Sequence, residues 1–312
     1  MKTAFKILAG VAIAAVAAFA WSFTAATLDV PALDIDSLPP ASPPASMSLS
    51  MLPTGSMKAS AGLAYRGGSF GDEREFTMGA ILVRHPRGNL MFDAGFGHRV
   101  DQHVAMLGAL MRALTEYSKG TAVGMQLTAQ GVPLDDLAGV VLTHAHWDHV
   151  SGLETLPGVP VWVTAAERNF IENGGEITAL IRSFKGVRYK EYSITGDPYL
   201  GFPNSYDVWG DGSIVLVPAP GHTPGSVIAF LALPSGTRYA LLGDLVWQME
   251  GIELPAERPW LARQLIGEDT RAVRESIGRM AAIHHRFPEM VMVPAHDARV
   301  FAKLPVFPEV VQ

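Results

Sequence analysis

Short apolar runs alternate with amphipathic stretches along most of the chain. The runs have the length of strands and end at Gly, Pro, Asp or His, which interrupt extended backbone. Pro86-Arg87-Gly88 separates the first two runs and predicts a hairpin turn. Strands that alternate with helical stretches indicate an α/β domain. We expect strands at residues 75–84, 89–92, 139–142, 159–163, 213–217, 239–242 and 290–293.

Other stretches place apolar residues three and four positions apart, the spacing of a helix with one buried face. We expect helices over residues 104–117, 165–172 and 269–285. The last of these begins at a capping residue, Asp269 or Thr270, and Pro288 lies beyond its end. Met and Leu residues crowd the segment 104–111. The pattern favours core packing for this segment over the lining of an apolar acyl pocket.

The first residues have the pattern of a targeting segment. Lys2 and Lys6 form a positive start, and an apolar, Ala-rich stretch follows. Small residues allow cleavage after Ala20 or Ala26. We predict that residues 1–26 are a signal peptide, or an N-terminal membrane anchor if they are not cleaved. The protein is then exported, either to the periplasm or out of the cell, or held at the inner membrane.

Residues 27–56 are rich in Pro, Ser and Ala. This composition predicts an extended linker that holds the domain away from the leader. A single α/β domain over residues 57–312 accounts for the rest of the chain. Hydrophobic residues make up 48% and charged residues 17%, so a sizeable core is available.

The net charge and the absence of cysteine limit the partners and the metal ligands that this protein can have. The net charge is −6 without a basic cluster, which argues against a nucleic-acid partner. Cysteine is absent, so neither a disulfide framework nor a thiolate ligand is available. Any metal must therefore be held by nitrogen and oxygen donors. The oligomeric state is not determined by these features.

Three histidines and an aspartate follow the apolar run 138–142 within one short stretch: His144, His146, Asp148 and His149. Neutral imidazole is the commonest protein ligand for zinc-type metals, and a carboxylate adds an oxygen donor. Side chains two apart on extended backbone face alike, so His144 and His146 point the same way. Asp148 and His149 come from the turn that follows. The arrangement suits two metal ions better than one.

Three further donors each follow a strand-like run. His222 lies in the tight Gly- and Pro-rich turn 220–225, Asp244 follows the run 239–242, and His296 follows the run 290–293. Taken singly, each of them is typical of a turn cap or a surface residue. Because donors at several strand ends can meet at one edge of a sheet, we expect these three to join the first four.

Because of these seven donors and their spacing, the chain resembles the metallo-β-lactamase superfamily over residues 76–296. The resemblance implies an αββα sandwich, with mixed sheets flanked by helices and the metals at the edge between the sheets. It also implies two divalent ions, with zinc favoured, although nitrogen and oxygen ligands accept manganese, iron or cobalt as well. The implied ligands are His144, His146 and His222 for one ion, Asp148, His149 and His296 for the other, and Asp244 between them.

Residues 85–95 resemble the hairpin and Asp-x-Gly turn that members carry before the metal motif. By this resemblance, Asp93 supports the metal loop through hydrogen bonds. The hairpin and Asp244 make the chain closest in appearance to the N-acyl homoserine lactonase branch. Trp247 departs from that branch, whose members often carry a Tyr there that contacts the substrate carbonyl. Its indole either replaces that contact or packs in the core.

The resemblance implies a dinuclear hydrolase that attacks a lactone or ester carbonyl of a small molecule with a metal-bridging hydroxide, and acyl homoserine lactones are the favoured substrates. Asp148 is also expected to pass a proton to the leaving group. A glyoxalase II-like thioesterase and a β-lactamase are alternatives within this class. An iron-dependent oxidoreductase of the same fold and a non-catalytic metal binder are alternatives from other classes.

Overall fold

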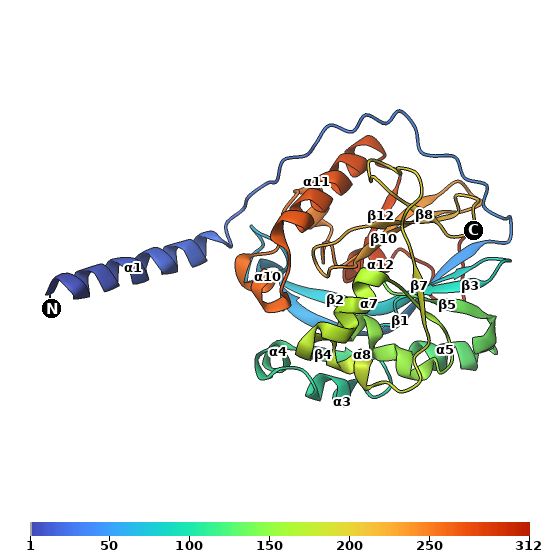
Figure 1. Cartoon of the computed structure of the whole chain (residues 1–312), viewed down its shortest axis with the longest axis horizontal. Helices are drawn as coiled ribbons and strands as arrows, with labels where there is room; N and C mark the ends of the chain where they lie inside the picture. Colours follow the sequence, from blue (N-terminus) through green and yellow to red (C-terminus); the bar gives the residue numbers. More distant parts are fainter. Residues whose placement is uncertain (1) are drawn as a thin grey trace.

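Two β-sheets pack face to face, and helices cover the outer side of each sheet (Figure 1). The computed structural model describes residues 2–312, and of residues 2–7, 9 and 11–13 only the backbone. The predicted α/β class and αββα sandwich are confirmed. The larger sheet has the order β4-β1-β2-β3-β5-β6-β7, with β1 (Ser48–Ser60), β2 (Glu73–Arg84), β3 (Asn89–Phe92), β4 (Glu116–Lys119), β5 (Leu137–Val141), β6 (Val161–Thr164) and β7 (Tyr189–Tyr192). The smaller sheet has the order β12-β11-β10-β9-β8, with β8 (Tyr206–Asp207), β9 (Ile214–Pro218), β10 (Val227–Ala232), β11 (Arg238–Gly243) and β12 (Val291–Pro294).

Apolar side chains fill the space between the sheets because alternate residues of each strand face inward. Leu90 and Phe92 of β3 belong to the same buried cluster as Leu216 of β9 and Leu241 of β11. Burial of each such side chain stabilises the fold by about 1.5–3 kcal/mol. The predicted hairpin is confirmed, since β2 and β3 pair antiparallel.

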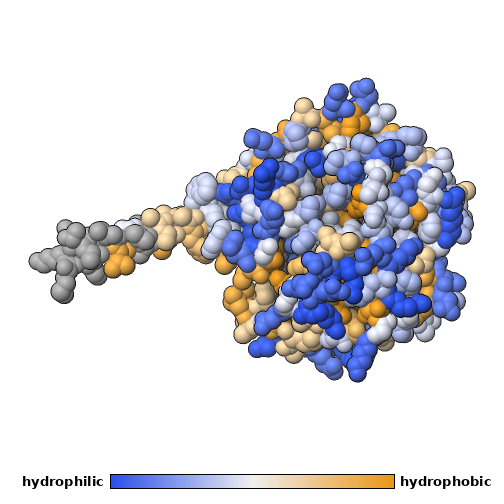
Figure 2. Space-filling model, in the orientation of Figure 1, coloured by the Kyte–Doolittle hydropathy of each residue, from blue (hydrophilic) through white to orange (hydrophobic). Residues whose placement is uncertain are grey.

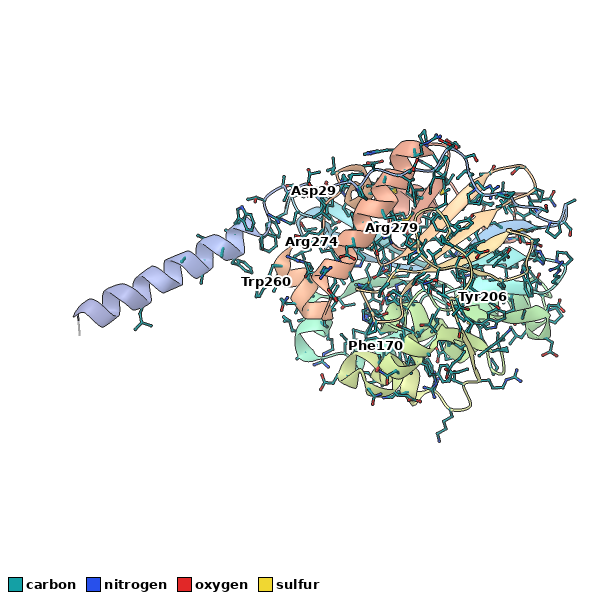
Figure 3. The ribbon with its side chains drawn as sticks, turned by 45° about the horizontal axis from the view of Figure 1, so that its top comes forward. Asp29, Phe170, Tyr206, Trp260, Arg274 and Arg279 are labelled. Carbon is teal, nitrogen blue, oxygen red and sulfur yellow. The ribbon has the colours of Figure 1, made fainter. Side chains whose placement is uncertain are left out.

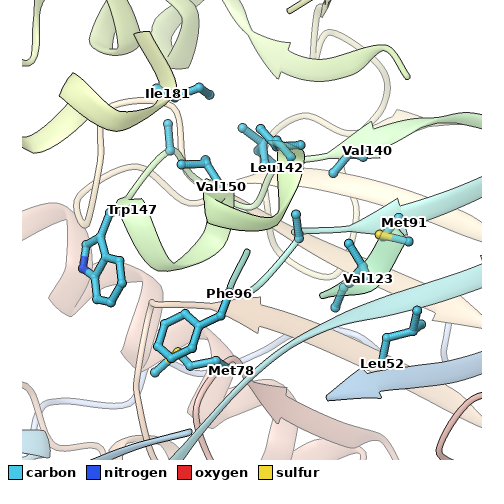
Figure 4. Close-up of a cluster of buried hydrophobic side chains, with 14 of the residues drawn as sticks. Leu52, Met78, Met91, Phe96, Val123, Val140, Leu142, Trp147, Val150 and Ile181 are labelled. Carbon is cyan, nitrogen blue, oxygen red and sulfur yellow. The ribbon is translucent and has the colours of Figure 1, made fainter. Parts of the chain in front are cut away.

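Helices enclose both sheets from outside. Beneath the larger sheet, Phe96 and Trp147 stack with their ring centroids 5.3 Å apart, within a second buried cluster (Figure 4). On the smaller sheet the longest of the covering helices begins at its predicted cap, Asp269, whose side chain accepts from the backbone N–H groups of Arg271 and Ala272. The helices after residue 60 are α2 (Ala61–Ala64), α3 (Val100–Ala105), α4 (Ala109–Leu114), α5 (Val123–Ala129), α6 (Trp147–Val150), α7 (Ala165–Asn173), α8 (Ala179–Ser183), α9 (Glu250–Glu253), α10 (Trp260–Ile266), α11 (Thr270–Arg286) and α12 (Ala298–Phe301), with 3-10 turns at Leu134–Asp136, Ser151–Thr155 and Gly175–Thr178.

The helix predicted over residues 104–117 is wrong in its extent. The chain forms α3 and α4, which are separated at Gly108, where ψ is 150° and the backbone is extended. Strand β4 follows and pairs with β1, so the sheet takes up the end of the predicted helix. Core packing is also wrong for α4, which has no buried residue: Leu110 is 57% and Leu114 51% exposed.

The predicted boundary at residue 57 falls inside β1, which begins at Ser48 and pairs with β2 along its length. Residues 27–47 contain no helix or strand. They run across the domain past α11 and do not hold it away from the leader (Figure 1). The physical reason is that apolar residues lie between the prolines and acids of this segment and pack against the core beneath α11. They are Leu28, Leu33, Ile35 and Leu38.

Helix α1 (Lys2–Trp21) projects from the domain next to α10 (Figure 1). The positive start predicted at Lys2 and Lys6 lies outside the described side chains. Among the residues that the structure describes, none of the helices has the length and apolar character needed to cross a bilayer. Cleavage of this segment, membrane anchoring and export all stay predictions.

Candidate metal centre

The seven predicted donors all lie together where strands give way to loops. β5 leads to the loop that carries His144, and β9, β11 and β12 lead to His222, Asp244 and His296. In three sets the ligand atoms all lie within 4.8 Å of one another: His144, His146 and His222; His144, His149 and Asp244; Asp148, His149 and His296. The predicted convergence at the edge of the sheets is therefore observed.

The first set has the spacing of ligands around one ion. His144 Nε2 lies 3.1 Å from His146 Nδ1 and 3.1 Å from His222 Nε2. Two imidazole nitrogens about 2.0–2.1 Å from a tetrahedral zinc ion stand roughly 3.3 Å apart. All three rings are buried, so water does not separate these nitrogens.

Asp244 faces both sides of the cluster. Its Oδ1 lies 3.1 Å from His149 Nε2 and 3.0 Å from His296 Nε2. Its Oδ2 lies 3.3 Å from His222 Nε2 and 4.0 Å from His144 Nε2. Oδ1 is buried and accepts no hydrogen bond from the described residues. The electron pairs of a carboxylate and of several imidazoles gathered this closely repel one another unless protons or a cation lie among them, so the cluster favours positive charge. The donors thus fit divalent metal ions.

Asp93 holds the loop after β5 as the resemblance implied. Its Oδ1 accepts the Thr143 N–H at 2.7 Å, and its Oδ2 accepts the Thr143 hydroxyl at 2.7 Å. His149 Nδ1 lies 2.8 Å from the same Oδ2 and donates to it. This contact fixes the His149 ring so that Nε2 faces the cluster.

A second buried carboxylate, which was not predicted from the sequence, joins two ligand loops. Glu167 of α7 accepts the Ala145 N–H at 2.6 Å, the Thr223 hydroxyl at 2.7 Å and the Gly225 N–H at 3.0 Å. Burial raises the pKa of Glu167 to about 7, against the lowering by these three hydrogen bonds. The available signal was its position four residues before the buried Ile171, on the inner face of a predicted helix.

We expect Glu167→Gln to loosen both ligand loops. The amide must turn its NH₂ group toward N–H or O–H donors, so at least one contact is lost. The free energy of unfolding should fall by about 1–3 kcal/mol, and metal affinity should fall about 10–100-fold. Thermal unfolding and metal titration measure the two effects. Glu172→Gln, at an exposed position of α7, is the matched control. Equal metal affinity in the two variants would contradict this role.

Arg258 and Trp247 fix the backbone and the carboxylate of Asp244. Arg258 is buried, pairs with Glu268 at 2.6 Å, and donates to the Asp244 carbonyl oxygen at 2.8 Å. Its guanidinium lies 4.9 Å from the Trp247 ring centroid. The Trp247 indole N–H donates to Asp244 Oδ2 at 2.8 Å. Because that donor is already used, Trp247 does not offer it to a substrate carbonyl.

Burial keeps the first set of histidines neutral. It lowers the pKa of His144 and of His222 well below the usual value, and the neighbouring imidazoles lower both further. Burial likewise lowers the pKa of His146 to about 4. Neutral imidazole is the form that binds metal, so these three rings are ready to bind at neutral pH.

The pKa values of His149 and His296 differ from those of the first set because carboxylates surround these two rings. Burial lowers the pKa of His149, but Asp93, Asp244 and Asp148 together outweigh burial and raise it well above the usual value. Burial also acts on His296, and there Asp244 and Asp148 raise the pKa overall. Without metal, these two rings therefore hold protons to a higher pH than ordinary histidines.

We expect the two sets to differ in the pH dependence of metal binding. An ion at His144, His146 and His222 displaces no proton near pH 7, whereas an ion at the other set displaces protons from His149 and His296. At a pH below the raised pKa values of His149 and His296, the affinity of this second set for metal should rise with pH. The rise should be roughly tenfold per pH unit for each proton released. Calorimetry in buffers of different ionisation enthalpy measures the release. Two binding steps without proton release would contradict the expectation.

A cavity of about 280 Å³ adjoins the cluster. Asp148, Asp244 and His296 form its polar end, and apolar side chains such as Phe76 and Leu265 line the rest. A cavity of this kind suits a molecule with one polar, reactive group and an apolar body.

The other five histidines lie outside the cluster, and among them His85 Nε2 lies 3.2 Å from Asp211 Oδ2. His98 is in a loop and His103 in α3, where His103 Nδ1 lies 2.7 Å from the Ser151 hydroxyl. His284 and His285 lie in the last turn of α11. Cations suit that end of a helix dipole without any metal.

Comparison with known proteins identifies the family. A model of the metallo-beta-lactamase superfamily matches residues 80–294. A probable metallo-hydrolase of Mycobacterium tuberculosis is 27% identical over 234 residues, which cover 71% of this chain and 74% of the relative. The N-acyl homoserine lactonase AttM of Rhizobium radiobacter is 25% identical over 271 residues, which cover 84% of this chain and 97% of the relative.

Solved structures share the fold. An N-acyl homoserine lactone hydrolase with the product N-hexanoyl-L-homoserine at its catalytic metal centre has a TM-score of 0.67 at 19% identity, and the match covers 85% of this chain and 98% of that one. From its family match, its relatives and its cluster of histidines and aspartates, this chain is a metallohydrolase that belongs to the metallo-β-lactamase superfamily.

Proposed function

We propose that this protein is a dinuclear metallohydrolase that opens lactone rings, with N-acyl homoserine lactones as favoured substrates. The observation that carries the proposal is the position of Asp244, whose two oxygens face two separate sets of histidines at the end of an apolar cavity. The N-acyl homoserine lactonase matched over 97% of its own length supports the substrate class.

The donors have distinct parts in this proposal. His144, His146 and His222 would hold one ion and Asp148, His149 and His296 the other, with Asp244 facing both sets. Two divalent ions, for which we favour zinc, would acidify a bound water and polarise the carbonyl that it attacks.

Asp148 moves the proton in this reaction. It lines the cavity, and its Oδ2 lies 3.5 Å from His296 Nε2. Water adds to the carbonyl carbon, the ring C–O bond breaks, and the released proton reaches the ring oxygen as it leaves. Asp148 takes the proton from the water and gives it to that oxygen. The apolar walls hold the acyl chain and exclude bulk water.

A substrate panel tests this function. We expect metal-loaded protein to open N-acyl homoserine lactones with a kcat/KM at least about tenfold above its values for a thioester and a cephalosporin. Mass spectrometry detects the ring-opened product. If the thioester or the cephalosporin is hydrolysed faster than the lactones, the protein is a thioesterase or a β-lactamase and not a lactonase. Iron together with oxygen consumption would indicate an oxidoreductase.

We infer that the protein works outside the cytoplasm. The Lys-containing start and the apolar, Ala-rich stretch after it support export. Fractionation of the producing cells, with sequencing of the N-terminus of the recovered protein, tests the inference. Intact protein confined to the cytoplasm would contradict it.

A further inference from the structure

Exposed apolar side chains border the cavity that leads to the metal donors. We call them the apolar rim: Phe70, Leu110, Leu114 and Trp260, which are 60%, 57%, 51% and 47% exposed. Leu110 and Leu114 lie on α4 and Trp260 on α10, and Phe70 packs near Gly62 of α2. Figure 2 shows apolar surface gathered between α10 and α4. Apolar side chains that cluster at the surface mark an interaction site far more often than scattered ones do.

The same short helices that carry the rim also line the cavity. Met111 and Leu114 of α4 and Leu261 and Leu265 of α10 face the cavity. The neighbouring Leu110 and Trp260 face solvent. An apolar path therefore runs from the outer surface to Asp148 at the metal donors.

Helix α1 joins the domain at this rim. The ring centroids of Phe19 and Trp260 lie 6.4 Å apart, and those of Phe23 and Phe70 lie 5.1 Å apart. Figure 3 places Trp260 on the side of the domain from which α1 leaves. Trp21, in the last turn of α1, is 65% exposed. The end of α1 and the apolar rim thus form one continuous surface.

Positive charge lies beside this surface. Arg66, Arg263 and Arg274 pair with a single carboxylate, that of Glu257, at 3.4, 3.1 and 2.6 Å. These three residues line a cavity of about 310 Å³ together with Trp260 and the end of α1. Arg66 and Arg263 are buried there, whereas the Arg274 side chain is 46% exposed. Three cations around one anion leave an excess of positive charge. Trp and Arg side chains beside exposed Leu and Phe are typical of proteins that lie at a membrane interface.

We propose that the apolar rim and the last turn of α1 dock on a lipid bilayer with anionic headgroups, and that the cavity takes amphiphilic substrates from that surface. Arg274, the exposed one of the three, contacts phosphate, and the rim side chains enter the acyl region. Charge favours a bilayer over a second copy of this chain, because a symmetric contact through this face would bring like charges together. The docking on a bilayer does not depend on the proposed function. The uptake of substrates from that bilayer rests on the proposed function.

The test is hydrogen exchange of the full chain with and without vesicles of phosphatidylcholine and phosphatidylglycerol. We expect amides of α4 and α10 to exchange roughly tenfold more slowly with vesicles. A rim variant with Phe70→Ser, Leu110→Ser and Trp260→Ser should lose this protection. The matched control is Met125→Ser with Val306→Ser, which are 45% and 47% exposed in the wild type and lie outside the rim. The control should keep the protection.

Hydrolysis of a short, water-soluble lactone should be equal in the rim variant and the wild type, because none of the three changed residues lines the metal cavity. Unchanged exchange in the presence of vesicles overturns the docking. Equal protection by vesicles of pure phosphatidylcholine overturns the part assigned to Arg274 and to the positive charge around it. Protection that grows with protein concentration without lipid overturns the bilayer in favour of a second copy. Exchange is measured without turnover, so a failed lactonase assay leaves this result intact.

Discussion

Exhaustive chelation is expected to abolish lactone hydrolysis, and added zinc is expected to restore it. Without metal, the buried donors leave no group that can activate water or polarise a carbonyl at neutral pH. Loss of several kcal/mol of transition-state stabilisation corresponds to a fall of about 10³–10⁵ in kcat/KM. The melting temperature should fall as well, because the ions bind the folded chain and not the unfolded chain.

Activity, metal content and thermal unfolding measured on the same samples check this expectation. His222→Ala removes one donor without a chelator and should lower both activity and metal content. His285→Ala, at an exposed position in the last turn of α11, is the matched control and should change neither. Protein that stays fully active after complete loss of metal would refute the proposed chemistry.

Asp148→Asn is expected to have the second-largest effect. The amide cannot take up a proton from the attacking water, so kcat should fall about 10²–10⁴-fold. The ion at His144, His146 and His222 should remain, since Asp148 lies outside that set.

Metal content must be measured beside kcat, because Asp148 is also a proposed ligand. Added metal that restores full content without restoring kcat would assign the loss to proton transfer. Asp136→Asn changes an exposed carboxylate outside the cluster and serves as the control. Unchanged turnover of Asp148→Asn at full metal content would remove Asp148 from catalysis.

Several structural details refine the proposed lactonase. The indole N–H of Trp247 is bound to Asp244 Oδ2, so the substrate carbonyl has no donor from this side chain. Met111 and Leu114 line the cavity, which is the acyl-pocket alternative that the sequence pattern did not favour for this part of the chain. Recognition of the substrate then depends on apolar contact and on the metal ions.

The metal donors and most of the strands could be predicted from the sequence because their signals are local. Alternating polarity follows from the two-residue repeat of a strand, and a donor directly after a strand lies at the sheet edge. The position of His144 and of Asp244 follows from that rule. Strand β10 was missed, although all six of its residues are buried and its apolar run is like those of β9 and β11.

Only the tertiary structure could decide contacts between residues far apart in the chain. Glu167 reaches Thr223, Arg258 fixes Asp244, and α4 turns Leu110 to solvent although its pattern resembles a core helix. The N-terminal segment packs against α11 although its composition is that of a linker. The spacing of apolar residues in the sequence predicts which side of a helix or strand is apolar. Packing of the two sheets and their helices determines what that side meets.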